Sequence, residues 1–215
     1  VVAAANPEPR LGLIDRALVA ALDAGLEPLL VVTKTDLGDA TALTGVYAPM
    51  GLRCLLVDQK SGAGVAAVAE ALKGHSTVLL GHSGVGKSTL VNALVPGADR
   101  ATGGVNEVTG RGRHTSTSAV ALPLPEDTGW VFDTPGIRSF GLAHVDPNKI
   151  IDSFPELDEG ADECPRACTH VSASGGTPPD CALDAWVEHG NAGSAGVDRL
   201  TSLRRLLVAL HTPSS

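Results

Sequence analysis

Hydrophobic residues recur at two spacings along this chain, and the two spacings predict alternating helices and strands. Apolar residues at helical intervals predict helices over residues 13–22, 65–72, 87–94 and 197–210. Short apolar runs predict buried strands over residues 28–32, 52–57, 76–80, 119–124 and 130–132. Strands that alternate with helices are typical of an α/β fold with a mostly parallel sheet.

Two stretches do not follow this alternation. Residues 95–118 are rich in Gly, Thr and Arg and have no periodicity, and a loop of that length inside a compact domain is usually functional. After about residue 148, Cys and His residues fall among Pro, Gly and Ser, which indicates a small separate unit. We therefore expect two domains, residues 1–148 and residues 149–215.

The composition of the chain excludes several classes of protein. The 215 residues are 43% hydrophobic and 19% charged, which excludes general disorder. No apolar run reaches the roughly 18 residues that a membrane helix needs. With 16 Lys and Arg against 24 Asp and Glu, the net charge of −8 excludes a basic surface over the whole protein but leaves room for local basic patches.

The segment between the strand 76–80 and the helix 87–94 matches the phosphate-loop pattern G-x-x-x-x-G-K-[ST]. Gly81 and Gly86 let the backbone turn tightly, so that amide groups can face phosphate oxygens. We expect Lys87 to contact the β- and γ-phosphates and the Ser88 hydroxyl to hold Mg²⁺. Other expected nucleotide contacts in this segment are Ser83, Gly84, Val85 and Thr89. The alternative is an ordinary Gly-rich turn between a strand and a helix.

A second motif, Asp133-Thr-Pro-Gly136, follows the strand 130–132. Downstream of a phosphate loop, the pattern D-x-x-G predicts a second metal and γ-phosphate site. Asp133 would hold the Mg²⁺ shell through water, and the Gly136 amide would sense the γ-phosphate. An ordinary Asp/Pro/Gly turn is the alternative.

Two further motifs indicate guanine recognition. Thr33-Lys34-Thr35-Asp36 follows the strand 28–32 and resembles the N-K-x-D motif of GTPases. The Asp36 carboxylate can accept hydrogen bonds from guanine N1–H and its amine, and Lys34 can pack on the base plane. Ser61 and Gly62 follow the strand 52–57 and resemble the companion motif S-A-[KL]. Alternatively, both are turns at strand ends, but together they favour guanine over adenine.

The order of these motifs is that of a circularly permuted GTPase, because the base motifs precede the phosphate loop. A sheet with nearby termini can be reopened elsewhere without moving its site. From about residue 11 to residue 210 the chain resembles the ribosome small-subunit-dependent GTPase A family. Besides the permuted order, the resemblance rests on G-R-G-R-H-T at 110–115, D-T-P-G-I at 133–137, F-P-E-L at 154–157 and the Cys/His cluster that follows.

The resemblance implies a circularly permuted P-loop GTPase domain with a small, mostly helical C-terminal zinc-binding domain. Two departures affect this expectation. Thr33 replaces the Asn of the guanine motif, so we expect only modest guanine affinity. The family also has an N-terminal OB-fold, which we do not expect within these 215 residues, so we expect part of the RNA affinity to be missing.

The long loop is predicted to carry the switch and the catalytic group. Thr115 is the first choice for a switch residue that coordinates Mg²⁺, and Thr117 is the second. Ras-like enzymes place a water-orienting Gln where this chain has Ile137, so intrinsic hydrolysis should be slow. The resemblance assigns this role to His114, whose alternatives are a solvated loop residue or a contact to RNA phosphate. Nearby basic side chains that can contact phosphate or RNA, or stay solvated, are Arg111 and Arg113.

The Cys/His cluster has the spacing Cys164-x₃-Cys168-x-His170-x₁₀-Cys181. Three thiolates and an imidazole form a closed tetrahedral zinc set, so we expect a structural zinc rather than a catalytic one. The alternative is three buried or reactive thiols with an unrelated His. Cys54 lies in a predicted strand and is expected to be a core residue.

The sequence therefore predicts a Mg²⁺-dependent GTPase switch that alternates between GTP and GDP. By resemblance it would be a cytoplasmic monomer that binds the small (30S) ribosomal subunit, with its 16S rRNA and proteins, in late maturation, and the subunit would stimulate hydrolysis. A zinc-containing RNA-binding module with a merely structural nucleotide site is the main alternative. An ATP-using P-loop enzyme is another, although Asp36 argues against it.

Overall fold

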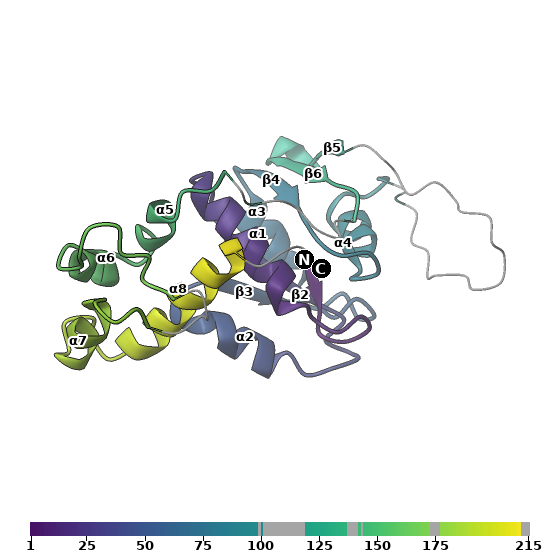
Figure 1. The fold of residues 1–215 in the computed structure, drawn as a ribbon. Coiled ribbons are helices and arrows are strands. Elements are labelled where there is room, and N and C mark those ends of the chain that lie inside the picture. Colours follow the sequence, from purple (N-terminus) through teal and green to yellow (C-terminus); the bar gives the residue numbers. More distant parts are fainter. Residues whose placement is uncertain (99, 101–118, 137–141, 143, 173–176, 212–215) are drawn as a thin grey trace, which may run out of the picture. The chain divides into compact units, whose positions relative to one another are not determined.

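The computed structural model describes residues 1–98, 100, 119–136, 142, 144–172 and 177–211. Strands and helices alternate through most of the chain, as the sequence predicts (Figure 1). The first part contains β1 (Val2–Ala3), α1 (Leu11–Asp23), β2 (Leu29–Thr33), α2 (Thr41–Tyr47), a 3₁₀ turn η1 (Ala48–Met50), β3 (Arg53–Leu56), α3 (Val65–Leu72), β4 (Ser76–Leu79) and α4 (Lys87–Leu94). The second contains β5 (Val120–Pro123), a 3₁₀ turn η2 (Pro125–Asp127), β6 (Trp130–Asp133), α5 (Asn148–Ile151), α6 (Pro155–Ala161), α7 (Leu183–Glu188) and α8 (Gly196–His211).

The described residues gather into two compact units, and each is built from separate stretches of sequence. Unit 1 takes its residues from the ranges 1–9, 29–44 and 54–138. Unit 2 takes its residues from 10–28, 45–53 and 139–215. Helix α1 thus belongs to the same unit as the C-terminal helices. The domain boundary expected near residue 148 stays a prediction.

Unit 1 contains two three-stranded sheets, in the orders β1-β2-β3 and β4-β6-β5. Strand β1 is parallel to β2, and β4 is parallel to β6, with Leu79 opposite Asp133. Strand β5 is antiparallel to β6, because the short η2 connection allows only a hairpin-like return. The Val1 amino group donates to the Leu80 carbonyl at 2.6 Å and so links the edges of the two sheets.

The core of unit 1 lies between the strands and the helices α3 and α4. Alternation along the strands sets it: Leu79 and Val131 are buried, whereas their neighbours Val78 and Trp130 are about half exposed. The buried side chains that form this cluster are Val31, Val57, Val68, Leu72, Leu79, Leu90, Val91, Leu94, Leu124 and Val131. This packing fixes the strand ends from which the predicted nucleotide motifs project.

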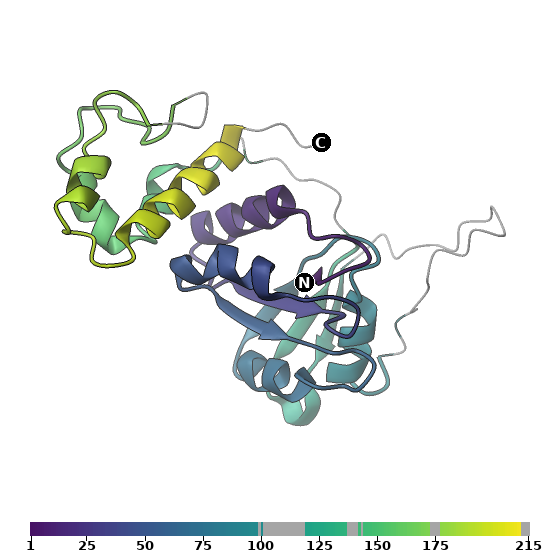
Figure 2. The same ribbon diagram turned by 90° about the horizontal axis from the view of Figure 1, so that it is seen from below.

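Unit 2 is helical, and α8 packs beside α1 (Figure 2). The leucine side chains at 200, 203, 206 and 207 of α8 are buried, with Leu203 and Leu206 at 0% exposure. Arg205 of α8 donates through Nε to Asp15 of α1 at 3.1 Å. Burial raises the pKa of Asp15, and the Arg205 charge opposes that rise. Helices α1 and α8 are therefore held together by buried leucines and by a partly buried ion pair.

Among the helices that the structure describes, none is long and apolar enough to cross a membrane.

Candidate functional site

The predicted phosphate loop leaves β4 and enters α4 with the backbone that its glycines allow. Gly84 and Gly86 adopt φ angles of 83° and 89°, in the left-handed region that favours glycine. Gly86 is the N-cap of α4, so the first amide groups of that helix have no intrahelical partner and are available to an anion. Ser88 and Thr89 stand in the first turn of α4 and are half-buried.

The carboxylate of Asp133 lies at the centre of the candidate site. It ends β6, is 1% exposed, and accepts a hydrogen bond from Lys87 Nζ, which also donates to the Thr134 carbonyl. Arg100 approaches the other carboxylate oxygen through Nε at 2.8 Å and Nη2 at 2.7 Å. Asn92 holds the Arg100 backbone, because its amide group bonds both the Arg100 N–H and the Arg100 carbonyl. Arg100 belongs to no motif, and the sequence did not single it out.

Gly136 lies directly against the phosphate loop. A Cβ atom at this position would be 3.1 Å from Ser83 N and 3.3 Å from Ser83 Cα. The Thr134 hydroxyl donates to the Leu79 carbonyl at 2.7 Å and ties the D-x-x-G segment to the end of β4. The structure therefore brings the two predicted phosphate motifs together.

The Thr33–Asp36 segment touches the phosphate loop through Thr33. The Thr33 side chain is fully buried, and its hydroxyl lies within hydrogen-bond distance of the Val85 carbonyl and, at 2.9 Å, of the Val2 carbonyl. Lys34 has a φ of 56°, and its Nζ donates to the Asn6 carbonyl. Asp36 is exposed, so its carboxylate is accessible to a ligand.

The loop after β3 is shaped by Asp58, which the sequence reasoning passed over. Its carboxylate accepts bonds from the Lys60 N–H at 2.8 Å, the Ser61 N–H at 3.1 Å and the Ser61 hydroxyl at 2.6 Å. The bonds from Ser61 and Lys60 hold the pKa of Asp58 below its usual value. The side chain that reaches the phosphate loop is Gln59, whose Nε2 donates to the Gly86 carbonyl at 2.7 Å. The predicted Ser61 hydroxyl is engaged with Asp58, and Gly62 adopts a φ of 78°.

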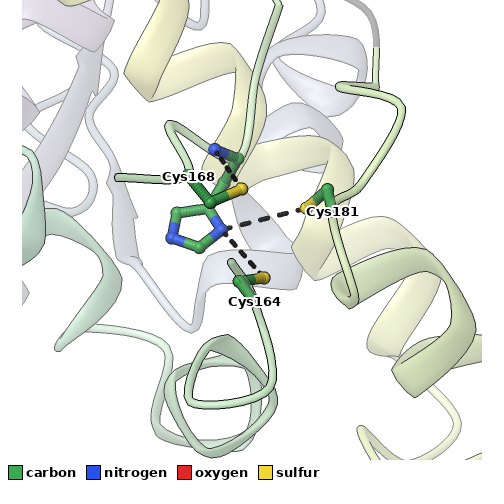
Figure 3. A group of neighbouring side chains, drawn as sticks. Cys164, Cys168 and Cys181 are labelled. Atoms are coloured by element: carbon green, nitrogen blue, oxygen red, sulfur yellow. Dashed lines mark hydrogen bonds between the residues drawn. The ribbon is translucent and has the colours of Figure 1, made fainter. Parts of the chain in front are cut away.

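A second candidate site, in unit 2, consists of the predicted cysteine and histidine ligands. The ligand atoms of Cys164, Cys168, His170 and Cys181 all lie within 4.8 Å of one another. Figure 3 shows the three cysteine side chains converging on one point. The Nδ1 atom of His170 is 3.6 Å from Cys164 Sγ and 3.8 Å from Cys181 Sγ.

These distances fit a zinc ion. Zn–S bonds of about 2.3 Å and Zn–N bonds of about 2.0 Å in a tetrahedron separate the two ligand atoms by about 3.5 Å. Three sulfur atoms and one imidazole nitrogen also form a donor set that Zn²⁺ prefers. Burial, with the Arg204 charge, lowers the pKa of His170, so the imidazole stays neutral and can act as a ligand.

The surroundings of the cluster fix its ligands in place. The Arg204 side chain donates to the His170 carbonyl at 3.0 Å and pairs with Asp184 at 2.6 and 2.8 Å. The Ala182 N–H points to Cys164 Sγ at 3.3 Å. Burial raises the pKa of the Cys164 thiol to about 11, and the charges of the neighbouring thiols add to the rise. A metal cation among these sulfur atoms would lower the thiol pKa instead, because a metal-bound thiol loses its proton.

Comparison with known proteins decides the family. The sequence model of the RsgA GTPase family matches residues 1–143. This chain belongs to the RsgA GTPase family. The proteins named small ribosomal subunit biogenesis GTPase RsgA from Ectopseudomonas mendocina and Pseudomonas aeruginosa are 40% and 39% identical to it over 217 residues. Each match covers 98% of this chain and 61% of the relative, so the chain spans about three fifths of their length.

Two solved structures are similar in fold to this chain. YjeQ from Thermotoga maritima is 27% identical, with a TM-score of 0.64 over 99% of this chain and 70% of that one. YloQ, described as a circularly permuted GTPase, shares the fold with a TM-score of 0.61 at 22% identity, over 99% of this chain and 68% of that one. The predicted fold class is confirmed, and the Cys₃His cluster fits the predicted C-terminal zinc-binding domain.

Several predicted RsgA site residues lie outside the described part of the chain. They are His114, Thr115, Thr117, Arg111, Arg113 and Ile137. Lys87, Asp133, Gly136 and Thr33 do meet around the phosphate loop, whereas Arg100, Asp58 and Gln59 were missed. No motif marks these three, since the types Arg, Asp and Gln occur anywhere on a protein surface. The roles of the predicted residues in binding and catalysis stay predictions.

Proposed function

We propose that this chain is a GTP-hydrolysing switch that binds the small (30S) ribosomal subunit and assists its late maturation. The observation that carries the proposal is the meeting of Lys87, Asp133 and Gly136 at the phosphate loop, in a chain of the RsgA GTPase family. The names of the relatives support the ribosomal part of the proposal, because they refer to biogenesis of the small subunit.

Nucleotide binding would use the two sets of loops at the strand ends. The amide groups from Gly81 to Thr89 would surround the phosphates, and Lys87 would turn from Asp133 to the β- and γ-phosphates. On the opposite side, the guanine would meet the predicted base contacts Thr33, Lys34, Asp36, Ser61 and Gly62. A Mg²⁺ ion held by Ser88, Thr115 and Asp133 would neutralise charge on the phosphates.

Hydrolysis would depend on His114 and on the partner. Ile137 stands in the sequence where Ras-like enzymes have Gln, and a hydrocarbon side chain cannot orient water. A neutral imidazole at His114 would orient or polarise the attacking water, with Thr115 and Lys87 at the γ-phosphate. Because such a loop must be ordered for the reaction, contact with 16S rRNA and ribosomal proteins would stimulate turnover.

The GTP-bound form would dock and the GDP-bound form would leave. Only the γ-phosphate can hold both Thr115 and Gly136, so only GTP would order the segment that meets the subunit. We propose that the protein acts as a monomer in the cytoplasm. Zn²⁺ held by Cys164, Cys168, His170 and Cys181 would be structural, because four protein ligands leave no open position.

The test is GTP turnover with and without purified small ribosomal subunits, with ATP as the nucleotide control. We expect GTP-specific stimulation, and we expect His114→Ala to lose turnover while it retains GTP binding. Tight GTP binding without stimulation would instead favour the RNA-binding module with a structural nucleotide site. Competition by ATP at an affinity similar to that of GTP would contradict the guanine assignment.

A further inference from the structure

Two side chains from the base loops hold consecutive carbonyl groups of the phosphate loop. The buried Thr33 hydroxyl, at the end of β2, contacts the Val85 carbonyl. Gln59, just after β3, donates through Nε2 to the Gly86 carbonyl at 2.7 Å. The loops proposed to read the base are therefore bonded to the loop proposed to hold the phosphates.

These bonds also orient the N–H groups that belong to the same peptide units as the two carbonyl groups. A peptide unit is planar and trans, so its carbonyl and its N–H point in opposite directions. A bond that holds the Val85 carbonyl orients the N–H of Gly86, and a bond that holds the Gly86 carbonyl orients the N–H of Lys87. In a phosphate loop it is these N–H groups that face the phosphate oxygens.

The Gln59 side chain packs closely against Gly86. A Cβ atom on Gly86 would lie 2.2 Å from Gln59 Nε2 and 2.7 Å from its Cδ, so the amide group of Gln59 packs directly on the glycine. The Gly86 carbonyl also accepts the Leu90 N–H of α4 at 3.0 Å, so both of its lone pairs have partners. The three hydrogen bonds to Asp58 hold the turn from which Gln59 projects.

We propose that Gln59 is a positioning residue that couples guanine recognition to binding of the β-phosphate, with Thr33 acting on the neighbouring carbonyl. This inference rests on the guanine-nucleotide function proposed above. A base that orders the loop after β3 also fixes the Lys87 N–H before the β-phosphate arrives. In this role Gln59 would act through the Gly86 peptide, to which its side chain is bonded.

The experiment compares the affinities of GMP, GDP and GTP for the wild-type chain and three variants by calorimetry with Mg²⁺, with ADP as the base control on the wild type. Gln59→Glu keeps the shape of the side chain but removes the donor, and Gln59→Ala removes the side chain without adding charge. Lys60→Ala is the matched control, because the exposed Lys60 side chain lies in the same loop and the variant keeps the Lys60 backbone N–H that bonds Asp58.

We expect Gln59→Ala and Gln59→Glu to lower the affinities for GDP and GTP by about 3- to 10-fold, which corresponds to one hydrogen bond. The affinity for GMP should fall by less than about twofold. Lys60→Ala should bind all three nucleotides like the wild type. The ratio of GDP to GMP affinity is the decisive number, because a merely structural role would weaken the three nucleotides equally and leave the ratio unchanged.

An unchanged ratio of GDP to GMP affinity in both Gln59 variants would overturn the proposed coupling between base and phosphate binding, even if GDP still binds. A wild-type chain that does not prefer GDP over ADP would overturn the guanine-nucleotide function, and this inference with it. The two failures are distinguishable, because the second appears in the wild type before any variant is compared.

Discussion

At the scale of single residues, the buried Asp133 carboxylate organises the candidate nucleotide site. A carboxylate that is 1% exposed is stable in its ionised form only with close cationic or hydrogen-bonding partners. Lys87 contacts one of its oxygens and Arg100 the other. The structure thus balances the charge of Asp133 with two side chains from the same unit.

Removal of Arg100 should therefore destabilise the nucleotide-free protein. We expect Arg100→Gln to lower the free energy of unfolding by about 1–3 kcal/mol, because a buried charge loses the cation that contacts one of its oxygens through two nitrogens. Urea unfolding of the nucleotide-free chain measures the loss. The control is Lys73→Gln, which removes a pair with Glu70 whose side chains are 54% and 69% exposed, and which should leave the free energy of unfolding almost unchanged. Equal losses in the two variants would contradict the prediction.

Sequence reasoning located the residues whose type is dictated by the chemistry. The proximity of Lys87, Asp133 and Gly136 was predictable because all three belong to motifs with a fixed spacing from a strand end and a glycine. Arg100 was not predictable, since it lies 33 positions from Asp133 and only the folded chain brings the two together. Gln59 was missed for a related reason: its partner is a backbone carbonyl, and a carbonyl leaves no mark in a sequence.

At the scale of elements, the long periodic helices and the short apolar strands β2 to β6 were predictable, and the shorter helices and β1 were not. Helices α3 and α4 have the predicted bounds, and α1 and α8 differ from prediction by one or two residues at each end. The prediction omitted β1, α2, α5, α6 and α7, whose lengths of two to seven residues give too few turns or alternations for a period to appear.

The contact between α7 and α8 behind the cysteine cluster gives a pH prediction. Arg204 of α8 holds Asp184 of α7, and this bond keeps the pKa of Asp184 below its usual value near 3.9. A lowered carboxyl pKa stabilises the folded state above the unfolded pKa, and that stability is lost as the pH falls through the folded pKa. Asp184→Asn should therefore lower the melting temperature at pH 7, and its difference from wild type should shrink as the pH falls below about 4, through the lowered pKa of Asp184.

Thermal unfolding from pH 3 to pH 7 tests this expectation. Asp152→Asn, at an exposed carboxylate just after α5, is the control and should follow the wild type throughout. A deficit of Asp184→Asn that stays constant down to pH 3 would show that lost packing, rather than lost charge, is the cause.

At the scale of the whole molecule, the order of motifs was the most informative feature of the sequence. Base motifs that precede a phosphate loop predicted a circularly permuted GTPase, and the family and fold bear this out. The composition of the two units was not predictable in the same way. Helix α1 lies near the start of the sequence but packs with α8, and only tertiary contacts reveal such a pairing.

Separate cores in the two units predict that loss of the zinc site leaves nucleotide binding intact. Cys168→Ser should reduce bound zinc from about one ion to well below one per chain and lower the melting temperature, because serine oxygen replaces a thiolate ligand. GDP affinity should stay within about twofold, since the described core cluster of unit 1 contains no residue of unit 2.

Metal analysis and GDP titration of the same samples measure both effects. Cys54→Ser is the matched control, because Cys54 lies in β3 and outside the cluster, and it should keep its zinc. Zinc retained by Cys168→Ser, or GDP binding lost with the zinc, would each contradict one half of the prediction.

The bonds from Thr33 and Gln59 to the phosphate loop also determine which part of the site is made first during synthesis of the chain. A chain grows from its N-terminus, so each donor is made before the carbonyl group that accepts its bond. Gln59 precedes Gly86 by 27 positions, and Thr33 precedes Val85 by 52. At roughly 5–20 residues per second, Thr33 waits about 3 to 10 s for its partner. In an unpermuted relative the phosphate loop would be made first, so the permutation reverses which half of the site must wait for the other.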